Sequence, residues 1–85
     1  MARVRFQFRH DRASTVTVAG DFNGWSTTSH PLERATDDLW TVDVDVSPGR
    51  HEYKFFVDGQ QWWNDPEAAK VPNPWGSENS YVDVP

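Results

Sequence analysis

The stretch LWTVDVDVSPGRHEYKFFVDG, residues 39–59, decides the fold of this chain. Apolar and polar residues alternate along 39–46 and again along 51–57, which is the pattern of strands with one buried face. Ser47-Pro48-Gly49 separates the two runs, and proline followed by glycine is typical of a tight turn. Asp58-Gly59 ends the second run and favours a hairpin, because glycine takes the positive φ that such a turn requires. The stretch therefore predicts two antiparallel strands and a third that returns after the hairpin.

Runs with the same two-residue period lie on both sides of this stretch, and no segment carries a helical stripe. The segment 65–76 contains three prolines and is expected to be a loop, with room for one helical turn at 67–70. About seven short strands separated by turn residues predict an all-β fold, an antiparallel β-sandwich. The expected strands are 3–9, 15–20, a short one around Leu32, 39–46, 51–57, 60–64 and 80–84.

Length, charge and composition exclude several classes of protein. Eighty-five residues without cysteine allow a single domain, spanning 1–85, and exclude a disulfide framework and a thiolate metal site. A net charge of −5 argues against nucleic acid as a partner. The apolar runs are too short to cross a membrane, and the N-terminus lacks the apolar core of a signal peptide. No membrane contact and a cytoplasmic location are therefore expected.

Four arginines near the N-terminus are the one basic cluster of the chain. The spacing of Arg3, Arg5 and Arg9 matches the outer face of a strand. We therefore expect them to be solvent-facing strand residues, and a phosphate or nucleic-acid site that rests on them and Arg12 is disfavoured.

Aromatic residues are the anomaly of the composition, because five tryptophans exceed what so small a core needs. Trp40 shares a strand face with alternating valines and is expected in the core, as are Tyr53 and Phe55 on the next strand. Some of the other indoles are expected at the surface, where exposed tryptophan marks a binding site.

Three motifs stand in order along the chain: GDFNGW at 20–25, YKFFVDG at 53–59, and WWNDP at 62–66, the last followed by PNPWG at 72–76 and by Asn79-Ser80. Together they resemble carbohydrate-binding module family 48. That family includes the glycogen-binding domain of AMP-activated kinase β subunits and the early-set domains of isoamylases and glycogen-branching enzymes. The PNPWG stretch is most similar to small stand-alone bacterial isoamylase early-set domain proteins. The resemblance covers 4–84 and implies an immunoglobulin-like early-set sandwich, in agreement with the strand pattern.

The resemblance also implies a function, the non-catalytic binding of α-1,4-linked glucan such as glycogen, starch or maltooligosaccharides. Indoles would stack on the C–H faces of glucose, while lysine and asparagine would bond its hydroxyls. Matched by motif, the family's sugar contacts fall on Trp25, Lys54, Trp62, Trp75, Ser77 and Asn79. Several of these residues also have a structural alternative: a plug of the core for Trp25, a solvated cation for Lys54, a lid on the sandwich end for Trp75 and a turn cap for Asn79.

Trp62 and Trp63 are neighbours on one strand, so only one of them can share the face of Lys54. A two-residue turn at 58–59 would pair Lys54 with Trp63. A three-residue turn at 58–60 would instead place Trp62 on the Lys54 face. The kinase β-subunit pattern has one residue fewer before its tryptophan, and the longer turn accommodates the extra glutamine here. We therefore expect Trp62 in the site, with Trp63 as the alternative.

No arrangement of residues predicts an enzyme. The acidic residues fall on turns or exposed strand faces, without the apolar surroundings expected of a glycosidase general acid. His10, His30 and His51 lack metal-ligand spacing, and the chain has neither a phosphate loop nor a nucleophile elbow. Neither a metal nor another cofactor is expected.

A second hypothesis is an early-set protein-interaction or packing module, with little or no sugar affinity. Its partner would be a glucan-metabolising enzyme or a kinase, and the exposed tryptophans would anchor the interface. Lys54 and Asn79 beside the indoles favour glucan, because a sugar needs such polar groups and a protein interface does not.

Overall fold

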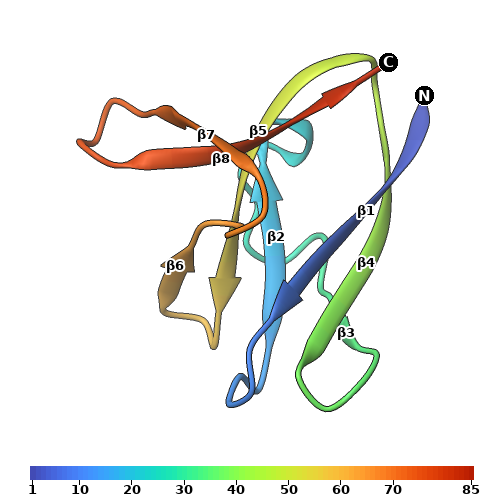
Figure 1. Ribbon diagram of the computed structural model, residues 1–85, viewed down its shortest axis with the longest axis vertical. Coiled ribbons are helices and arrows are strands. Elements are labelled where there is room, and N and C mark those ends of the chain that lie inside the picture. Colours follow the sequence, from blue (N-terminus) through green and yellow to red (C-terminus); the bar gives the residue numbers. More distant parts are fainter.

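The computed structural model describes all 85 residues and consists of two antiparallel sheets packed face to face (Figure 1). The smaller sheet has the order β1-β4-β3, and the larger one has the order β2-β5-β8-β7 with β6 also paired to β5. The expected all-β sandwich is confirmed, with eight strands where about seven were predicted. The strands are β1 (Ala2–Arg9), β2 (Val16–Gly20), β3 (Glu33–Arg34), β4 (Leu39–Val46), β5 (Gly49–Val57), β6 (Gln61–Trp63), β7 (Ala69–Pro72) and β8 (Glu78–Val84).

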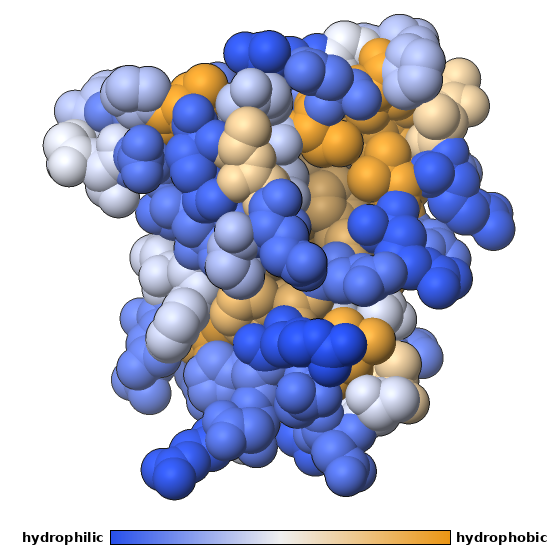
Figure 2. All heavy atoms as spheres, in the orientation of Figure 1, coloured by the Kyte–Doolittle hydropathy of each residue, from blue (hydrophilic) through white to orange (hydrophobic).

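The core lies between the sheets and is built by the two-residue alternation of the strands. Phe6 and Phe8 of β1 point inward and stand opposite Val42 and Trp40 of β4. Trp40, Tyr53 and Phe55 are buried, as predicted. Figure 2 shows a largely hydrophilic surface on this side of the molecule, with hydrophobic atoms visible in the band between the sheets. Burial of this apolar surface is the main stabilising term in a chain without disulfides.

The outer face of the smaller sheet carries the basic cluster. The register of β1 and β4 places Arg3 opposite Asp45 and Arg5 opposite Asp43. Arg5 donates to Asp43 through two nitrogens at 2.9 and 3.2 Å, and Arg9 donates to Asp38 at 3.0 Å. Three of the four arginines are thus solvent-facing strand residues with acidic partners, as the spacing predicted.

One predicted segment is wrong. The loop expected at 65–76, with a helical turn at 67–70, contains the strand β7, which pairs with β8 from Ala69 opposite Tyr81 to Pro72 opposite Glu78. The residues at 67–70 are good helix formers, but pairing with an open strand edge outweighs that weak local preference. Proline at the end of an edge strand is tolerated, because its missing N–H faces no further strand.

The central strand β5 brings distant segments together. Its first half pairs with β8 and its second half with β6, whereas β2 pairs with the opposite edge. Consequently β6 and β8 follow one another along the same edge of β5, and the β7–β8 hairpin projects beside β6 (Figure 1).

Candidate functional site

A groove of about 780 Å³ lies on the outer face of the larger sheet. Its floor carries Glu52 and Lys54, which alternate along β5 with the buried Tyr53 and Phe55. Its walls come from the loop after β2, from β6 and from the β7–β8 hairpin. The groove is lined by Asp21, Trp25, Glu52, Lys54, Trp62, Asn73, Pro74, Trp75, Ser77 and Asn79.

The six residues matched by motif all line this one groove, although they come from four separate segments of the chain. They are Trp25, Lys54, Trp62, Trp75, Ser77 and Asn79. Three indoles are partly or largely exposed there, with Trp25 at 37%, Trp62 at 47% and Trp75 at 87%. Trp63 is the one candidate that does not line the groove.

The length of the β5–β6 turn decides which neighbouring tryptophan faces the groove. Val57 pairs with Gln61 and Phe56 with Trp62, so the turn has three residues and Trp62 lies on the Lys54 face, as predicted. The Trp62 ring packs on Phe56 with centroids 4.6 Å apart. Trp63 points to the opposite side.

The environment of Trp63 is a packing site at the rim of the sandwich. Its ring lies 6.0 Å from Phe8 and 5.5 Å from His10, both in edge-on contacts. Its indole N–H donates to Gln61 at 3.2 Å. A structural role for this side chain follows from these contacts.

The loop that presents Trp25 is held by Asn23. The Asn23 side-chain oxygen accepts from the N–H groups of Gly20 and Ser26, both at 3.1 Å, and its amide donates to the Val18 carbonyl at 3.1 Å. Trp25 itself has a φ of 60°, in the left-handed region that bulky residues seldom adopt, and its N–H donates to the Gly20 carbonyl at 2.8 Å. Three hydrogen bonds of one side chain thus fix the turn that presents Trp25.

Asn73 holds the loop that presents Trp75 through side-chain to backbone hydrogen bonds, as Asn23 holds the Trp25 loop. Its side-chain oxygen accepts from the backbone N–H groups of Trp75 at 3.0 Å and of Ser77 at 3.1 Å. The Trp75 ring therefore projects from a defined turn, with 87% of its surface free.

The polar residues of the groove differ in what they can still offer a ligand. Asn79 is engaged twice, because its oxygen accepts from Asn73 and its amide donates to Glu52, both at 3.1 Å. The ammonium of Lys54 has no partner within the chain, so all its donors are free. The sequence predicted Asn79 as a sugar contact and did not reveal these two internal bonds.

Asp21, Glu52, Asn73 and Pro74 also line the groove, and sequence reasoning did not place them there. Glu52 could have been found, because it lies two residues before Lys54 and so shares its strand face. The others enter through loop geometry that a periodic pattern does not encode.

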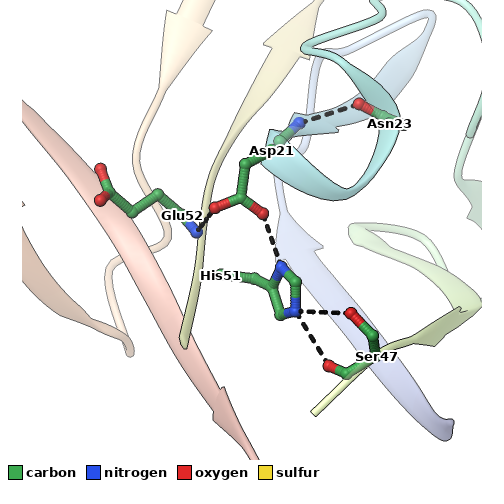
Figure 3. A network of polar contacts seen from close by, with 6 residues as sticks. Asp21, Asn23, Ser47, His51 and Glu52 are labelled. Carbon is green, nitrogen blue, oxygen red and sulfur yellow. Dashed lines mark hydrogen bonds and ion pairs between the residues drawn. The ribbon is translucent and has the colours of Figure 1, made fainter. Parts of the chain in front are cut away.

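Asp21 links the Trp25 loop to β5 and to the turn before it (Figure 3). One carboxylate oxygen lies 2.6 Å from Nδ1 of His51, and the other accepts from the Glu52 N–H at 3.0 Å. The second ring nitrogen of His51 lies 2.9 Å from the Ser47 carbonyl. The carboxylate and the carbonyl can only accept, so a ring that donates to both is an imidazolium, and the Ser47 hydroxyl also lies 3.4 Å from the second ring nitrogen. The bond to Asp21 accordingly raises the pKa of His51 above its ordinary value, with a further contribution from Ser47.

This pair predicts a pH-dependent stability. A raised pKa in the folded state means that the stabilisation is complete below the unfolded pKa of about 6.5 and is lost as the pH rises through the higher folded pKa. Because the His51 side chain is 14% exposed and that of Asp21 is 42% exposed, we expect the loss to be about 1 kcal/mol or less. Urea unfolding of the parent and of His51→Gln between about pH 5.5 and 8.5 measures it. If the free energy of unfolding changed with pH equally in the two proteins, this role of His51 would be contradicted, since His10 and His30 are common to both.

The structure contains no group of three or more histidine, cysteine, aspartate or glutamate side chains placed to hold a metal ion. No helix in it has the length and apolar character needed to cross a membrane.

Comparisons with known proteins show which family the chain belongs to. A family profile described as the glycogen recognition site of AMP-activated protein kinase matches residues 2–85. The β-2 subunit of 5′-AMP-activated protein kinase is 41% identical over 69 residues in both Mus musculus and Homo sapiens. The human β-1 subunit is 39% identical over the same length. Each alignment covers 81% of this chain but 24% of the relative, so the chain spans about a quarter of these subunits. The chain belongs to the family of glycogen recognition sites of AMP-activated protein kinase.

Proposed function

We propose that residues 1–85 form one glucan-binding domain, which binds α-1,4-linked glucan in the groove and catalyses no reaction on it. Glycogen, starch and maltooligosaccharides all contain this α-1,4 linkage and are the expected ligands. The observation that carries the proposal is the meeting of three exposed indoles and one unpaired ammonium in a single groove.

The chemistry of glucose fits these groups. Each ring has an apolar C–H face, which gains from contact with a flat indole, and a rim of hydroxyls, which need donors and acceptors. Trp62 and Trp25 offer faces on two sides of the groove, Trp75 would act as a wedge from the hairpin, and Lys54 would donate from the floor. Asn79 and Ser77 would add polar contacts at the edge.

The groove contains two carboxylates, Asp21 and Glu52, and Asp21 is engaged in structural bonds. Glycoside hydrolysis needs a pair of carboxyl groups, one acting as acid and the other as nucleophile or base. Both oxygens of Asp21 are held, one by His51 and one by the Glu52 N–H. Glu52 alone does not supply the pair.

A second candidate is a protein-interaction module. It is favoured by the 87% exposure of Trp75, which no other part of the chain covers, and by relatives that are subunits of a kinase. In that case the partner would be a glucan-metabolising enzyme or a kinase, and the indoles would anchor the contact.

Titration with maltoheptaose, followed by tryptophan fluorescence, tests the proposal. We expect a saturable change with a Kd on the order of 10 µM to 1 mM, because the site is open and wet. Cellohexaose, which has the β linkage, is the control and should give no saturable change. No response to maltoheptaose at millimolar concentration would refute the glucan proposal and favour the protein partner.

A further inference from the structure

Glu52 occupies the floor of the groove beside Lys54, and half of its carboxylate is unused. Its Oε1 accepts from the Asn79 amide at 3.1 Å, whereas Oε2 has no partner within the chain. Figure 3 shows this side chain extending away from Asp21 and His51, so it takes no part in their network. Its backbone N–H is fixed by Asp21 at 3.0 Å, which holds this part of the strand in place.

The other groove side chains offer mainly donors to a sugar. Lys54 and the three indoles carry N–H groups and no accepting atom. The side-chain oxygen of Asn73 accepts two backbone N–H groups, and that of Asn79 accepts from Asn73. Each oxygen of Asp21 is engaged in one hydrogen bond. Each of these oxygens thus already holds at least one hydrogen bond, whereas Oε2 of Glu52, like the exposed hydroxyl of Ser77, holds none within the chain and keeps its full accepting capacity.

A bound glucose needs such an acceptor. Each hydroxyl is a donor as well as an acceptor, and a donor that is desolvated without a partner costs binding free energy. A hydrogen bond from a hydroxyl to a carboxylate is stronger than one to a neutral oxygen. Adjacent hydroxyls of a glucose ring project side by side, so one can donate to a carboxylate while its neighbour accepts from an ammonium.

Resting on the proposed function, we infer that Glu52 is a sugar-binding residue whose free carboxylate oxygen accepts a hydrogen bond from a glucose hydroxyl, while Lys54 donates to the hydroxyl next to it. The bond from Asn79 to the other oxygen restrains the carboxylate within the groove lining. The pair Glu52 and Lys54 thus supplies the acceptor and the donor that a vicinal diol requires.

Two substitutions separate this role from a purely positioning one. Glu52→Gln keeps an oxygen for the Asn79 amide but replaces the free carboxylate oxygen with an NH₂ donor. Glu52→Ala removes both the acceptor and the partner of Asn79. Glu33→Gln is the matched control, because Glu33 is exposed on β3 of the other sheet and undergoes the same change of charge.

The experiment is calorimetric titration of the parent and the three variants with maltoheptaose, after circular dichroism has compared their folding. We expect Glu52→Gln to bind about 5- to 10-fold more weakly than the parent, Glu52→Ala at least as weakly, and Glu33→Gln within about twofold of it. Glu52→Gln within about twofold of the parent would overturn the inference, whatever Glu52→Ala does, because Glu52 would then act at most through Asn79. A parent protein that binds no maltoheptaose would overturn the proposed function itself. The two failures are thus distinct.

Discussion

Replacing Trp62 with alanine is expected to weaken maltoheptaose binding by about 30-fold, the equivalent of about 2 kcal/mol. The ring is 47% exposed and lies over Phe56, which holds it at the edge of the groove. The substitution removes a stacking face of the proposed site and little core volume. Fluorescence or calorimetric titration measures the affinity, and retention on glycogen in a native affinity gel gives an independent readout.

The neighbouring tryptophan is the matched control. Trp63→Ala removes the same side chain from the adjacent position, but this ring packs against Phe8 and His10 outside the groove. We expect its affinity to stay within about twofold of the parent, and its free energy of unfolding to fall by about 1 to 2 kcal/mol. Undiminished binding by folded Trp62→Ala, or lost binding by folded Trp63→Ala, would refute the assignment of the two faces.

The opposite roles of these neighbours could be predicted from the sequence, because a strand has a strict two-residue period. Once the turn length is fixed, the face of every residue on β6 follows. The extra glutamine before Trp62 indicated a three-residue turn, and the pairing of Val57 with Gln61 confirms it. The same period placed Trp40 and Phe55 in the core.

The polar chemistry of the groove could not be predicted in the same way. Whether Asn79 is free or engaged depends on Asn73 and Glu52, and the contact with Glu52 joins positions 27 residues apart. Those contacts depend on the course of the hairpin, which a local pattern does not encode. The strand β7 was missed for a related reason, because its pairing with β8 is tertiary and outweighs the helical preference of its residues.

Ser80→Ala is expected to lower the free energy of unfolding by about 2 to 3 kcal/mol, although it deletes a single oxygen. Ser80 is fully buried on β8, with 0% of its surface exposed. Its hydroxyl accepts from the Asp65 N–H at 2.8 Å and donates to the Asn64 side chain at 2.9 Å. Alanine would leave both partners without this bond, and a desolvated polar group without a partner costs more than the bond itself contributes.

The loss would be large for a chain of this size, whose total stability is on the order of 5 kcal/mol. Urea unfolding measures it, with Ser14→Ala as the control, because Ser14 is exposed and its hydroxyl bonds to no other group. We expect the control to change stability by about 0.5 kcal/mol or less. Unchanged stability of Ser80→Ala would show that water replaces the hydroxyl.

Ser80 also connects the core to the proposed site. Tyr53 donates its hydroxyl to Asp65 at 2.7 Å, so Asp65 is tied to β5 by Tyr53 and to β8 by Ser80. Trp62 stands three residues before Asp65, and these ties fix the end of the short strand that carries it. Folded Ser80→Ala should therefore keep its preference for maltoheptaose over cellohexaose but bind it a few-fold more weakly, because ordering β6 would then oppose binding. An unchanged affinity in the folded variant would mean that pairing with β5 alone positions Trp62.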